Sequence, residues 1–424
     1  MYINDILKSI KYFLTELRTL KYLLLLADGM ADYKYDILDG KTLLQYAHTP
    51  NMDRLAPFSV LGTARTIPDG YPPGSDVANL AVMGYDPRRY YTGRSPLEAV
   101  SLGVTMEEQD LSLRCNLVTL SDEENFAEKI MLDYSAGEIS SAESVQLIDA
   151  IRSALGSDEF HFHAGISYRH LLLWKNARGR SLQLTPPHDI SDRKIGAYLP
   201  QGSDGHILLQ LMQASQAVLE QHPVNLARIG QGLKPANSIW LWGEGIRPAM
   251  DSFAAKYGLQ GSVVCAAYLV KGLGLCAGLT PVKVEGATGA IKTNFTGKAR
   301  AALDELKRGQ DFVYLHIEAP DEAGHQGDMQ AKIWAIEQID QHVLGLILEE
   351  MDGFDDLRLL IMPDHPTPIT IKTHSSDPVP FMLYDKNHPR TSSAREFNEI
   401  TAGEGIFFED GFKLMDYFIN ERNL

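Results

Sequence analysis

The chain has 424 residues, of which 44% are hydrophobic, 22% charged and 9% aromatic. These values are typical of a soluble globular protein of two or three domains, and they exclude a disordered or fibrous chain. The net charge is −16, from 39 lysines and arginines against 55 aspartates and glutamates, which argues against a nucleic-acid-binding protein because such a protein needs a basic surface.

The first twenty residues predict an amphipathic helical extension rather than a signal peptide, because charged residues interrupt their apolar positions. The apolar side chains on one face of this helix are Ile6, Ile10, Phe13, Leu14 and Leu17. We expect the extension to pack on the core; self-association and an upstream start codon are the alternatives. The longest apolar run nearby, residues 23–27, is far shorter than the roughly 20 residues that cross a bilayer, so we predict no membrane span.

The three cysteines, Cys115, Cys265 and Cys276, contain no CxxC pair. Their small, odd number fits buried thiols in a reducing compartment and gives little support to a thiolate metal site or a cysteine nucleophile. We therefore predict a cytoplasmic protein.

Short apolar runs, each followed by a helical pattern, predict an α/β fold with a mostly parallel sheet sandwiched by helices. These runs are residues 22–27, 238–242, 261–267, 311–317 and 357–362. The middle of the chain differs, because strand-like segments there flank one long helical pattern at residues 141–155.

We therefore expect two domains. A core domain comprises residues 1–105 and 237–424, and a smaller α+β domain is inserted at residues 106–236. The proline- and glycine-containing segment at 222–237 is expected to be the linker that returns to the core.

Asp28 follows the first predicted strand, in the turn Ala27-Asp28-Gly29. Ligands of open α/β sheets bind beyond the carboxyl ends of the strands, so Asp28 is well placed for a site. An Asp-Gly pair after a strand is more often a simple turn, and this feature alone does not decide between the two.

Ser75 follows a rigid Pro/Gly loop and begins an apolar helical stretch. In one interpretation Ser75 or Asp76 only caps the helix. In the other, the backbone N–H groups at the helix start favour an anion, and the Ser75 hydroxyl becomes a phosphate ester.

Aspartates and histidines follow two further predicted strands near the C-terminus: Asp321, His325, Asp364, His365 and, nine residues later, His374. These are the residue types that bind Zn²⁺ or Mn²⁺. A lone histidine is usually structural, but the joint placement after strands is hard to assign to packing. Because no base adjoins Ser75 in sequence, metal coordination is the means to lower its pKa. The residues alone indicate a dinuclear-metal enzyme that transfers a phosphoryl or sulfuryl group through Ser75.

Ten sequence blocks resemble, in family order, the cofactor-independent phosphoglycerate mutases of the archaeal-type branch of the alkaline phosphatase superfamily. The resemblance covers nearly the whole chain from Lys21 onward. The blocks are ADGMAD (27–32), TPNMDRLA (49–56), PPGSDVANLAVMGYDP (72–87), YTGRSPLEA (91–99), HAGISYRHLL (163–172), TPPHDI (185–190), KGLG (271–274), APDEAGHQGD (319–328), PDHPTP (363–368) and THSSDPVPF (373–381).

The resemblance implies two divalent metal ions, with Mn²⁺ as the first candidate and Zn²⁺, Co²⁺ or Mg²⁺ as alternatives. The residues that would hold one ion are Asp321, His325 and His374. Those that would hold the other are Asp28, Ser75, Asp364 and His365. Every one of these positions carries the residue type that the family has there.

The implied reaction interconverts 3-phosphoglycerate and 2-phosphoglycerate in glycolysis through a phosphoserine at Ser75, without 2,3-bisphosphoglycerate. The inserted domain would then be a lid that excludes water. Expected contacts for the substrate are His163, Arg169, His188, Asp189, Arg94, Arg114 and Lys271. We expect no nucleic-acid or membrane partner, and the sequence leaves a homo-oligomer open.

Three alternatives remain at this point. Another phosphomutase or a phosphomonoesterase would use the same metal ligands and Ser75, because the superfamily shares them. A homoserine-kinase activity, proposed for members of this branch, would need ATP, and the chain has no GxxxxGK[ST] loop. A non-enzymatic scaffold should have lost some of the ligands, whereas here none is missing.

Overall fold

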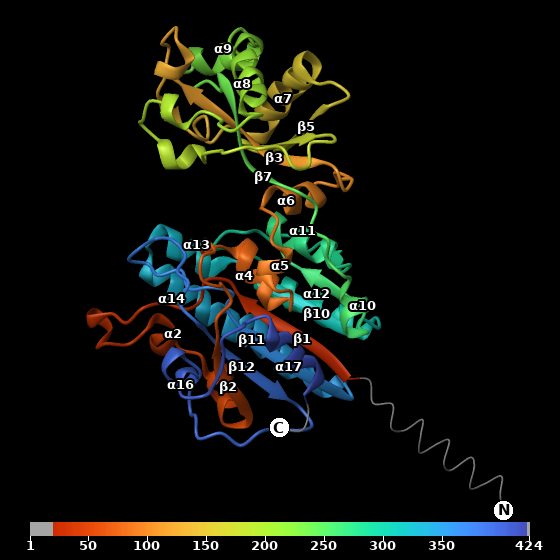
Figure 1. Cartoon of the computed structure of the whole chain (residues 1–424). Coiled ribbons are helices and arrows are strands. Elements are labelled where there is room, and N and C mark those ends of the chain that lie inside the picture. The colour runs from red at the N-terminus through yellow and green to blue at the C-terminus, as the bar shows by residue number, and fades with distance from the viewer. Residues whose placement is uncertain (1–19, 422–424) are drawn as a thin grey trace, which may run out of the picture. The chain divides into compact units, whose positions relative to one another are not determined.

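The computed structural model describes residues 20–421 and divides the chain into two compact units (Figure 1). Unit 1 combines the described residues up to Tyr91 with the segment from Met250 onward, and unit 2 is Thr92–Ala249. The predicted N-terminal helix lies outside the described residues except for Leu20, which begins the first strand. None of the helices in the described part of the chain is both long and apolar enough to cross a membrane.

Unit 1 contains an eight-stranded sheet in the order β13-β2-β12-β11-β1-β10-β8-β9. Its strands are β1 (Leu20–Ala27), β2 (Ser59–Ala64), β8 (Gly261–Val264), β9 (Thr280–Val282), β10 (Phe312–Ile317), β11 (Asp356–Met362), β12 (Val379–Asp385) and β13 (Ile406–Phe408). Only β12 runs antiparallel to its neighbours β11 and β2. The predicted mostly parallel α/β sheet is therefore confirmed.

Strand β1 lies at the centre of this sheet, between β10 and β11. Its sequence LKYLLLLA is buried from Lys21 onward, as expected for a parallel strand covered on both faces. The register pairs Ala27 with Ile317 and Leu26 with Met362. The three strands therefore end at the same edge, and the residues that follow them are brought together.

Helices cover both faces of the sheet in unit 1. On one face Leu23 and Leu25 share a core with apolar residues of α12 (Phe295–Lys307) and α14 (Met329–Gln338). On the other face Tyr22 packs against Phe418 of α17 (Lys413–Asn420), with ring centroids 5.5 Å apart. The helices of unit 1 are α2 (Leu43–Tyr46), α3 (Pro50–Leu55), α4 (Ser75–Val82), α5 (Pro87–Tyr90), α10 (Phe253–Tyr257), α11 (Tyr268–Cys276), α12 (Phe295–Lys307), α13 (Ala319–Gln326), α14 (Met329–Gln338), α15 (Gly345–Glu350), α16 (Glu399–Gly403) and α17 (Lys413–Asn420), with a π-helical segment at Ile339–Leu344.

Unit 2 contains a five-stranded antiparallel sheet. Its strands are β3 (Leu111–Leu120), β4 (Met131–Asp133), β5 (Phe160–Ile166), β6 (Arg169–Trp174) and β7 (Ser238–Gly245). Its helices are α6 (Ser95–Ser101), α7 (Ser141–Leu155), α8 (Gly205–Leu219) and α9 (Pro223–Gly230). The predicted helix at 141–155 coincides with α7, whose N-terminus is fixed by a capping box between Ser140 and Glu143.

Two segments differ from the sequence-based expectation. The run at 238–242 forms β7, which pairs antiparallel with β3 in unit 2 instead of joining the parallel sheet. The expected linker contains helix α9, whose Asn225 and Arg228 are buried. A short apolar run does not reveal which sheet it joins, and the proline at the start of α9 is as compatible with a first helical turn as with a linker.

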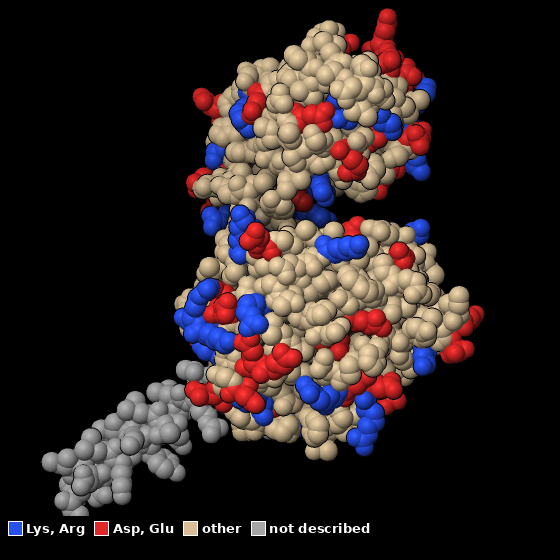
Figure 2. All heavy atoms as spheres, turned by 180° about the vertical axis from the view of Figure 1, so that it is seen from behind, with Lys and Arg blue, Asp and Glu red and all other residues tan. Residues whose placement is uncertain are grey.

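Charged side chains are mixed on the visible face of each unit, with basic and acidic groups next to one another (Figure 2). The face that Figure 2 shows therefore carries both signs of charge, although acidic residues outnumber basic ones in the chain.

Candidate active site

The ends of β1, β10 and β11 bring the predicted acidic and histidine residues of unit 1 together. Asp28 directly follows β1, and Asp364 and His365 follow β11. Asp321 and His325 lie one turn apart on α13, which begins two residues after β10, and His374 lies in the loop before β12.

These side chains form two groups, each with ligand atoms within 4.8 Å of one another: Asp28, Asp364 and His365 in one, and Asp321, His325 and His374 in the other. In the first group, which is buried, His365 Nε2 lies 3.3 Å from Asp364 Oδ2 and 3.6 Å from Asp28 Oδ1. In the second, His325 Nε2 and His374 Nε2 lie 3.0 Å apart.

The two groups adjoin each other. The rings of His365 and His374 have centroids 4.0 Å apart. Asp321 Oδ1 lies 3.5 Å from His374 Nε2, and its Oδ2 lies 3.4 Å from His325 Nε2. Ligand sets so close together can act on one substrate group.

The chemistry of both groups fits divalent cations, because carboxylates and imidazoles are ligands for Zn²⁺ and Mn²⁺. Asp28 Oδ1 is buried and has no hydrogen-bond partner, which is unfavourable for a carboxylate unless a cation faces it. Burial and the charges of Asp364 and Asp321 raise the pKa of Asp28 well above its usual value. A bound cation would relieve this unfavourable clustering of negative charge.

The electrostatics of the second group differ. Burial disfavours the charged carboxylate of Asp321, but hydrogen bonds from His325 and His374 outweigh that effect and hold its pKa well below the usual range. The hydrogen bond with Asp321 is also the main reason why the pKa of His325 is raised to about 8. Burial instead lowers the pKa of His365, which keeps this imidazole in the neutral form that binds metals.

Ser75 is the first residue of α4, and its Oγ lies 3.0 Å from His365 Nε2. A helix start stabilises an anion through its free backbone N–H groups and the helix dipole. The structure therefore presents a hydroxyl at an anion-favouring position, next to the group formed by Asp28, Asp364 and His365.

Asn79, four residues further along α4, connects this helix to Asp364. Its amide donates to the Ser75 carbonyl at 2.8 Å and to Asp364 Oδ2 at 2.7 Å, and its Oδ1 accepts from the Tyr314 hydroxyl at 2.5 Å. Asn79 is fully buried. The side-chain amide of Asn79 thus holds the Ser75 backbone and the Asp364 carboxylate in fixed positions.

A buried chain of charged groups supports Asp28. His316 Nε2 lies 3.1 Å from Asp28 Oδ2, and His316 Nδ1 lies 3.3 Å from Glu318 Oε1. Glu318 is in turn paired with Lys298. Burial acts against a charged imidazole, but the contacts with Asp28 and Glu318 outweigh it and raise the pKa of His316 to about 10.

Five residues of this site were not predicted from the sequence: Asn79, Tyr314, His316, Glu318 and Lys298. Asn79 lies one helical turn after Ser75. His316, in β10, and Glu318, directly before α13, lie five and three residues before Asp321. The sequence does carry a signal for such residues: a polar residue within an otherwise apolar strand or helix, such as the histidine in FVYLHI, is rarely buried without a partner.

Several of the expected substrate contacts form a continuous cluster in unit 2. Glu98 Oε1 and Oε2 accept from Arg94 at 3.2 Å and from Arg114 at 3.1 Å, respectively. The Arg114 guanidinium lies 4.3 Å from the centroid of the Trp242 ring, which contacts His188 at 5.3 Å between ring centroids. The Glu98 carboxylate is therefore shared by two arginines.

Two aromatic rings extend the cluster towards Arg169. Tyr134 packs against both His188 and Tyr168, with centroid distances of 6.1 and 5.8 Å, and the Arg169 guanidinium lies 5.2 Å from the Tyr168 ring. Asp189, mostly exposed, lies 3.6 Å from His188 Nε2. The structure thus brings Arg94, Arg114, Arg169, His188 and Asp189 into one region.

The two other expected substrate contacts have different surroundings. His163 lies on β5 with a buried Nε2 that makes no hydrogen bond, and burial together with the charges of Arg152 and His161 lowers its pKa. Lys271 belongs to unit 1, on α11, where its Nζ lies 5.8 Å from the centroid of the Tyr268 ring.

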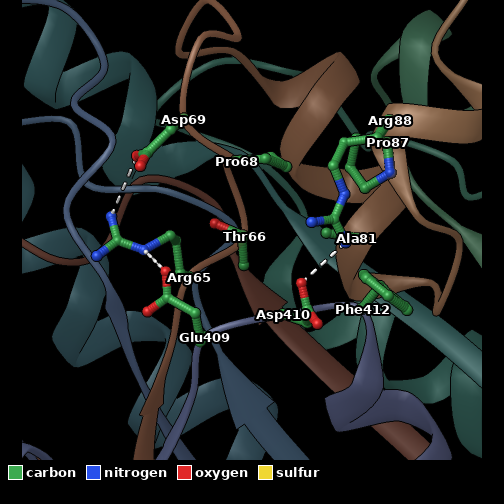
Figure 3. A pocket seen from close by; sticks show the side chains of 11 residues that line it. Arg65, Thr66, Pro68, Asp69, Ala81, Pro87, Arg88, Glu409, Asp410 and Phe412 are labelled. Carbon is green, nitrogen blue, oxygen red and sulfur yellow. Dashed lines mark hydrogen bonds and ion pairs between the residues drawn. The ribbon is translucent and has the colours of Figure 1, made fainter.

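A cavity of about 190 Å³ in unit 1 is lined by Arg65, Arg88 and the segment 409–412 (Figure 3). Arg65 pairs with Glu409 at 3.1 Å, and Arg88 pairs with Asp410 at 2.8 Å. Because both guanidinium groups already face carboxylates, we assign no anion-binding role to this cavity.

A family profile described as 2,3-bisphosphoglycerate-independent phosphoglycerate mutase matches residues 56–225. A Geobacter sulfurreducens protein described as a probable enzyme of that name is 50% identical over 402 residues, covering 95% of this chain and 100% of the relative. The Methanosarcina mazei enzyme of the same name is 47% identical over 387 residues, covering 91% and 96%.

Solved structures agree in fold. A Pyrococcus horikoshii protein aligns with a TM-score of 0.79 and 30% identity, covering 95% of this chain and 98% of the other. The cofactor-independent phosphoglycerate mutase of Thermoplasma acidophilum aligns with a TM-score of 0.65 and 24% identity, covering 94% and 98%. With half of its residues shared across the full length of a curated relative, the chain belongs to the 2,3-bisphosphoglycerate-independent phosphoglycerate mutase family.

Proposed function

We propose that the protein interconverts 3-phosphoglycerate and 2-phosphoglycerate by way of a phosphoserine at Ser75. The observation that carries this proposal is the Ser75 hydroxyl, 3.0 Å from His365 Nε2, at the start of a helix and beside a buried group of carboxylates and histidine. Membership of a family named for this reaction supports the choice of substrate.

Two divalent cations, with Mn²⁺ as the first candidate, would be held by the two groups described above and would lower the pKa of the Ser75 hydroxyl and stabilise charge on the transferred phosphoryl group. The residues proposed to hold them are Asp28, Ser75, Asp364 and His365 for one, and Asp321, His325 and His374 for the other.

Ser75 would attack phosphorus, so that a bond from phosphorus to Ser75 Oγ forms while the bond to one glycerate oxygen breaks. The proton lost from Ser75 balances the proton gained by the departing glycerate hydroxyl. After the glycerate turns, its other hydroxyl takes the phosphoryl group back and Ser75 recovers its proton. The N-terminus of α4 stabilises the phosphoserine through its backbone N–H groups.

The cationic cluster of unit 2 is the proposed site for the glycerate carboxylate. Arg94, Arg114 and Arg169 supply the positive charge, and Glu98 neutralises only part of it. Unit 2 would also serve as the lid that keeps water from the phosphoserine, since access of water would convert a mutase into a phosphatase. We propose the cytoplasm as the compartment, in keeping with the three free cysteines.

The first test is turnover of 3-phosphoglycerate by the Mn²⁺-loaded protein, coupled to enolase, with phosphate release followed in the same sample. We expect 2-phosphoglycerate to form without phosphate release. Phosphate release alone would indicate a phosphomonoesterase with the same metal groups, and no reaction would indicate a different phosphorylated substrate.

A further inference from the structure

Thr367 touches one residue of each candidate metal group. This residue is fully buried in the loop that follows β11, two positions after His365. Its Oγ1 lies 2.5 Å from Asp321 Oδ1 and 3.2 Å from His365 Nδ1. One hydroxyl therefore links the group of Asp321, His325 and His374 with the group of Asp28, Asp364 and His365.

The hydrogen-bonding capacity of these atoms fixes the direction of both bonds. An ionised carboxylate oxygen can only accept, so the single hydroxyl proton of Thr367 is donated to Asp321. The hydroxyl oxygen can then only accept from His365, which requires the proton of that imidazole to be on Nδ1. The lone pair of His365 is consequently on Nε2, the atom that faces Ser75 Oγ, Asp28 and Asp364.

Hydrogen bonds to its backbone fix the position of Thr367. Its backbone N–H donates to the Ala31 carbonyl at 3.3 Å, and its carbonyl accepts from Lys332 Nζ at 2.7 Å. Lys332 is fully buried and is paired with Asp32 at 2.8 Å. Lys332, on α14, thus ties the loop after β1 to the loop after β11 and fixes the backbone of Thr367.

Two glycines, Gly29 and Gly324, lie directly against Thr367. A Cβ atom at Gly29 would lie 2.5 Å from Thr367 Oγ1, and one at Gly324 would lie 2.4 Å from the Thr367 carbonyl oxygen. The loop after β1 and helix α13 can approach the threonine this closely because Gly29 and Gly324 lack a side chain. The environment thus orients the hydroxyl towards Asp321 and His365.

We propose that Thr367 is a positioning residue that prepares both metal groups at once, by selecting the Nδ1–H form of His365 and by orienting the carboxylate of Asp321. Groups that hold ligands in this way commonly change metal affinity 10–100-fold when removed. The inference rests on the proposed metal groups, but its first prediction concerns the metal-free protein and does not depend on catalysis.

The first measurement is the tautomer of His365 in the metal-free, full-length protein, read by long-range ¹H–¹⁵N correlation NMR at slightly alkaline pH. The His365 signals are identified by their absence from the His365→Asn variant. We expect the Nδ1–H pattern in the wild type, which needs no Thr367 variant to fold. The Nε2–H pattern in the wild type would overturn the proposal.

The second measurement is Mn²⁺ binding by Thr367→Val, which keeps the branched shape and removes the hydroxyl, and by Thr367→Ser, which restores the hydroxyl. The valine variant should lose the uniform Nδ1–H pattern and bind both ions about 10–100-fold more weakly, whereas the serine variant should bind within about 3-fold of the wild type. Thr119→Val is the matched control, because the buried Thr119 hydroxyl donates to the Pro235 carbonyl at 2.6 Å in unit 2, and its Mn²⁺ binding should not change.

Unchanged affinity for both ions in a folded Thr367→Val variant would contradict the proposal. The measurements distinguish a failure of this proposal from a failure of the proposed function. A wild type with the Nδ1–H form, two Mn²⁺ ions and no turnover of 3-phosphoglycerate would refute the proposed function alone, and normal turnover in Thr367→Val with wild-type Mn²⁺ affinity would refute the role of Thr367 alone.

Discussion

Ser75 combines a small side chain with a position that is central to the proposed chemistry. Its Oγ contacts His365, while its backbone carbonyl is held by Asn79. Removing the hydroxyl therefore takes away the proposed nucleophile but leaves the hydrogen bond that anchors the start of α4.

We expect Ser75→Ala to lower kcat for mutase turnover by roughly 10⁴-fold or more, because the variant lacks the proposed nucleophile. The enolase-coupled assay measures this loss, and thermal unfolding should show little change in stability. Ser59→Ala, which removes a buried hydroxyl at the start of β2 that donates to the Leu55 carbonyl, should keep normal turnover. Near-normal activity of Ser75→Ala would eliminate the phosphoserine.

The buried His170 should make the stability of unit 2 depend on pH. Burial lowers its pKa from 6.5 to about 3, and its Nδ1 accepts from the Gly165 N–H at 3.0 Å. Because the folded-state pKa lies below the unfolded one, the unfolded chain binds a proton first as the pH falls. The contribution of His170 to stability is therefore complete above pH 6.5 and declines as the pH falls from 6.5 towards 3, by up to about 1.4 kcal/mol per pH unit.

The free energy of unfolding, measured with urea at pH 7.5, 6.0 and 5.0, should fall less steeply for His170→Asn than for the wild type. The asparagine carbonyl can accept from Gly165 but cannot take up a proton in this range. The slopes of the free energy of unfolding against pH are compared, because the variant also loses packing, and hence stability, at every pH. Parallel slopes would show that His170 is not kept neutral by burial.

At the scale of elements, the carboxyl ends of β1, β10 and β11 meet because their register aligns Ala27 with Ile317 and Leu26 with Met362. The loop after β1 must then pass close to α13. Gly29 allows this approach: its φ is +63°, and a Cβ there would lie 2.7 Å from Asp321 Cα.

We expect Gly29→Ala to lower the free energy of unfolding by about 2–4 kcal/mol, from the positive φ and from the forced displacement of Asp321 and Thr367. Gly40→Ala is the matched control, because Gly40 has φ +75° but no atom within 4 Å of an added Cβ, and it should cost only about 1 kcal/mol. Urea unfolding compares the two variants. If the two variants lose the same free energy of unfolding, the close contact of residue 29 with Asp321 and Thr367 does not contribute to the cost of Gly29→Ala.

The strands that position the site were predictable because a parallel strand covered on both faces is a short, uninterrupted apolar run, as in residues 22–27 and 357–362. Asp28, Asp364 and His365 follow such runs directly and were predicted with them. Asn79, His316 and Thr367 were not, because their importance arises from contacts with segments that are remote in sequence. The run at 238–242 was assigned to the wrong sheet for a related reason: its pattern specifies a strand but not its partner.

At the scale of the whole molecule, the proposed metal groups combine residues from both ends of the chain, so cations should stabilise the fold of unit 1. Removing the ions with a chelator should abolish mutase turnover and lower the Tm, and Mn²⁺ should restore both. At an ion concentration 100-fold above Kd, the expected stabilisation is about 2.7 kcal/mol per site. Full activity in a sample verified as metal-free by elemental analysis would rule out the two metal groups.

The central place of β1 in its sheet has a consequence for the order in which the protein forms on the ribosome. Both neighbours of β1, namely β10 and β11, are synthesised only after unit 2 is complete. Unit 2 is a continuous segment and can fold as it emerges, whereas the leucine-rich β1 has no partner strand until residues 312–317 appear. The first strand among the described residues thus stays unpaired until after unit 2 and β8 are made, and a nascent chain that stalls before β10 leaves it without a partner strand.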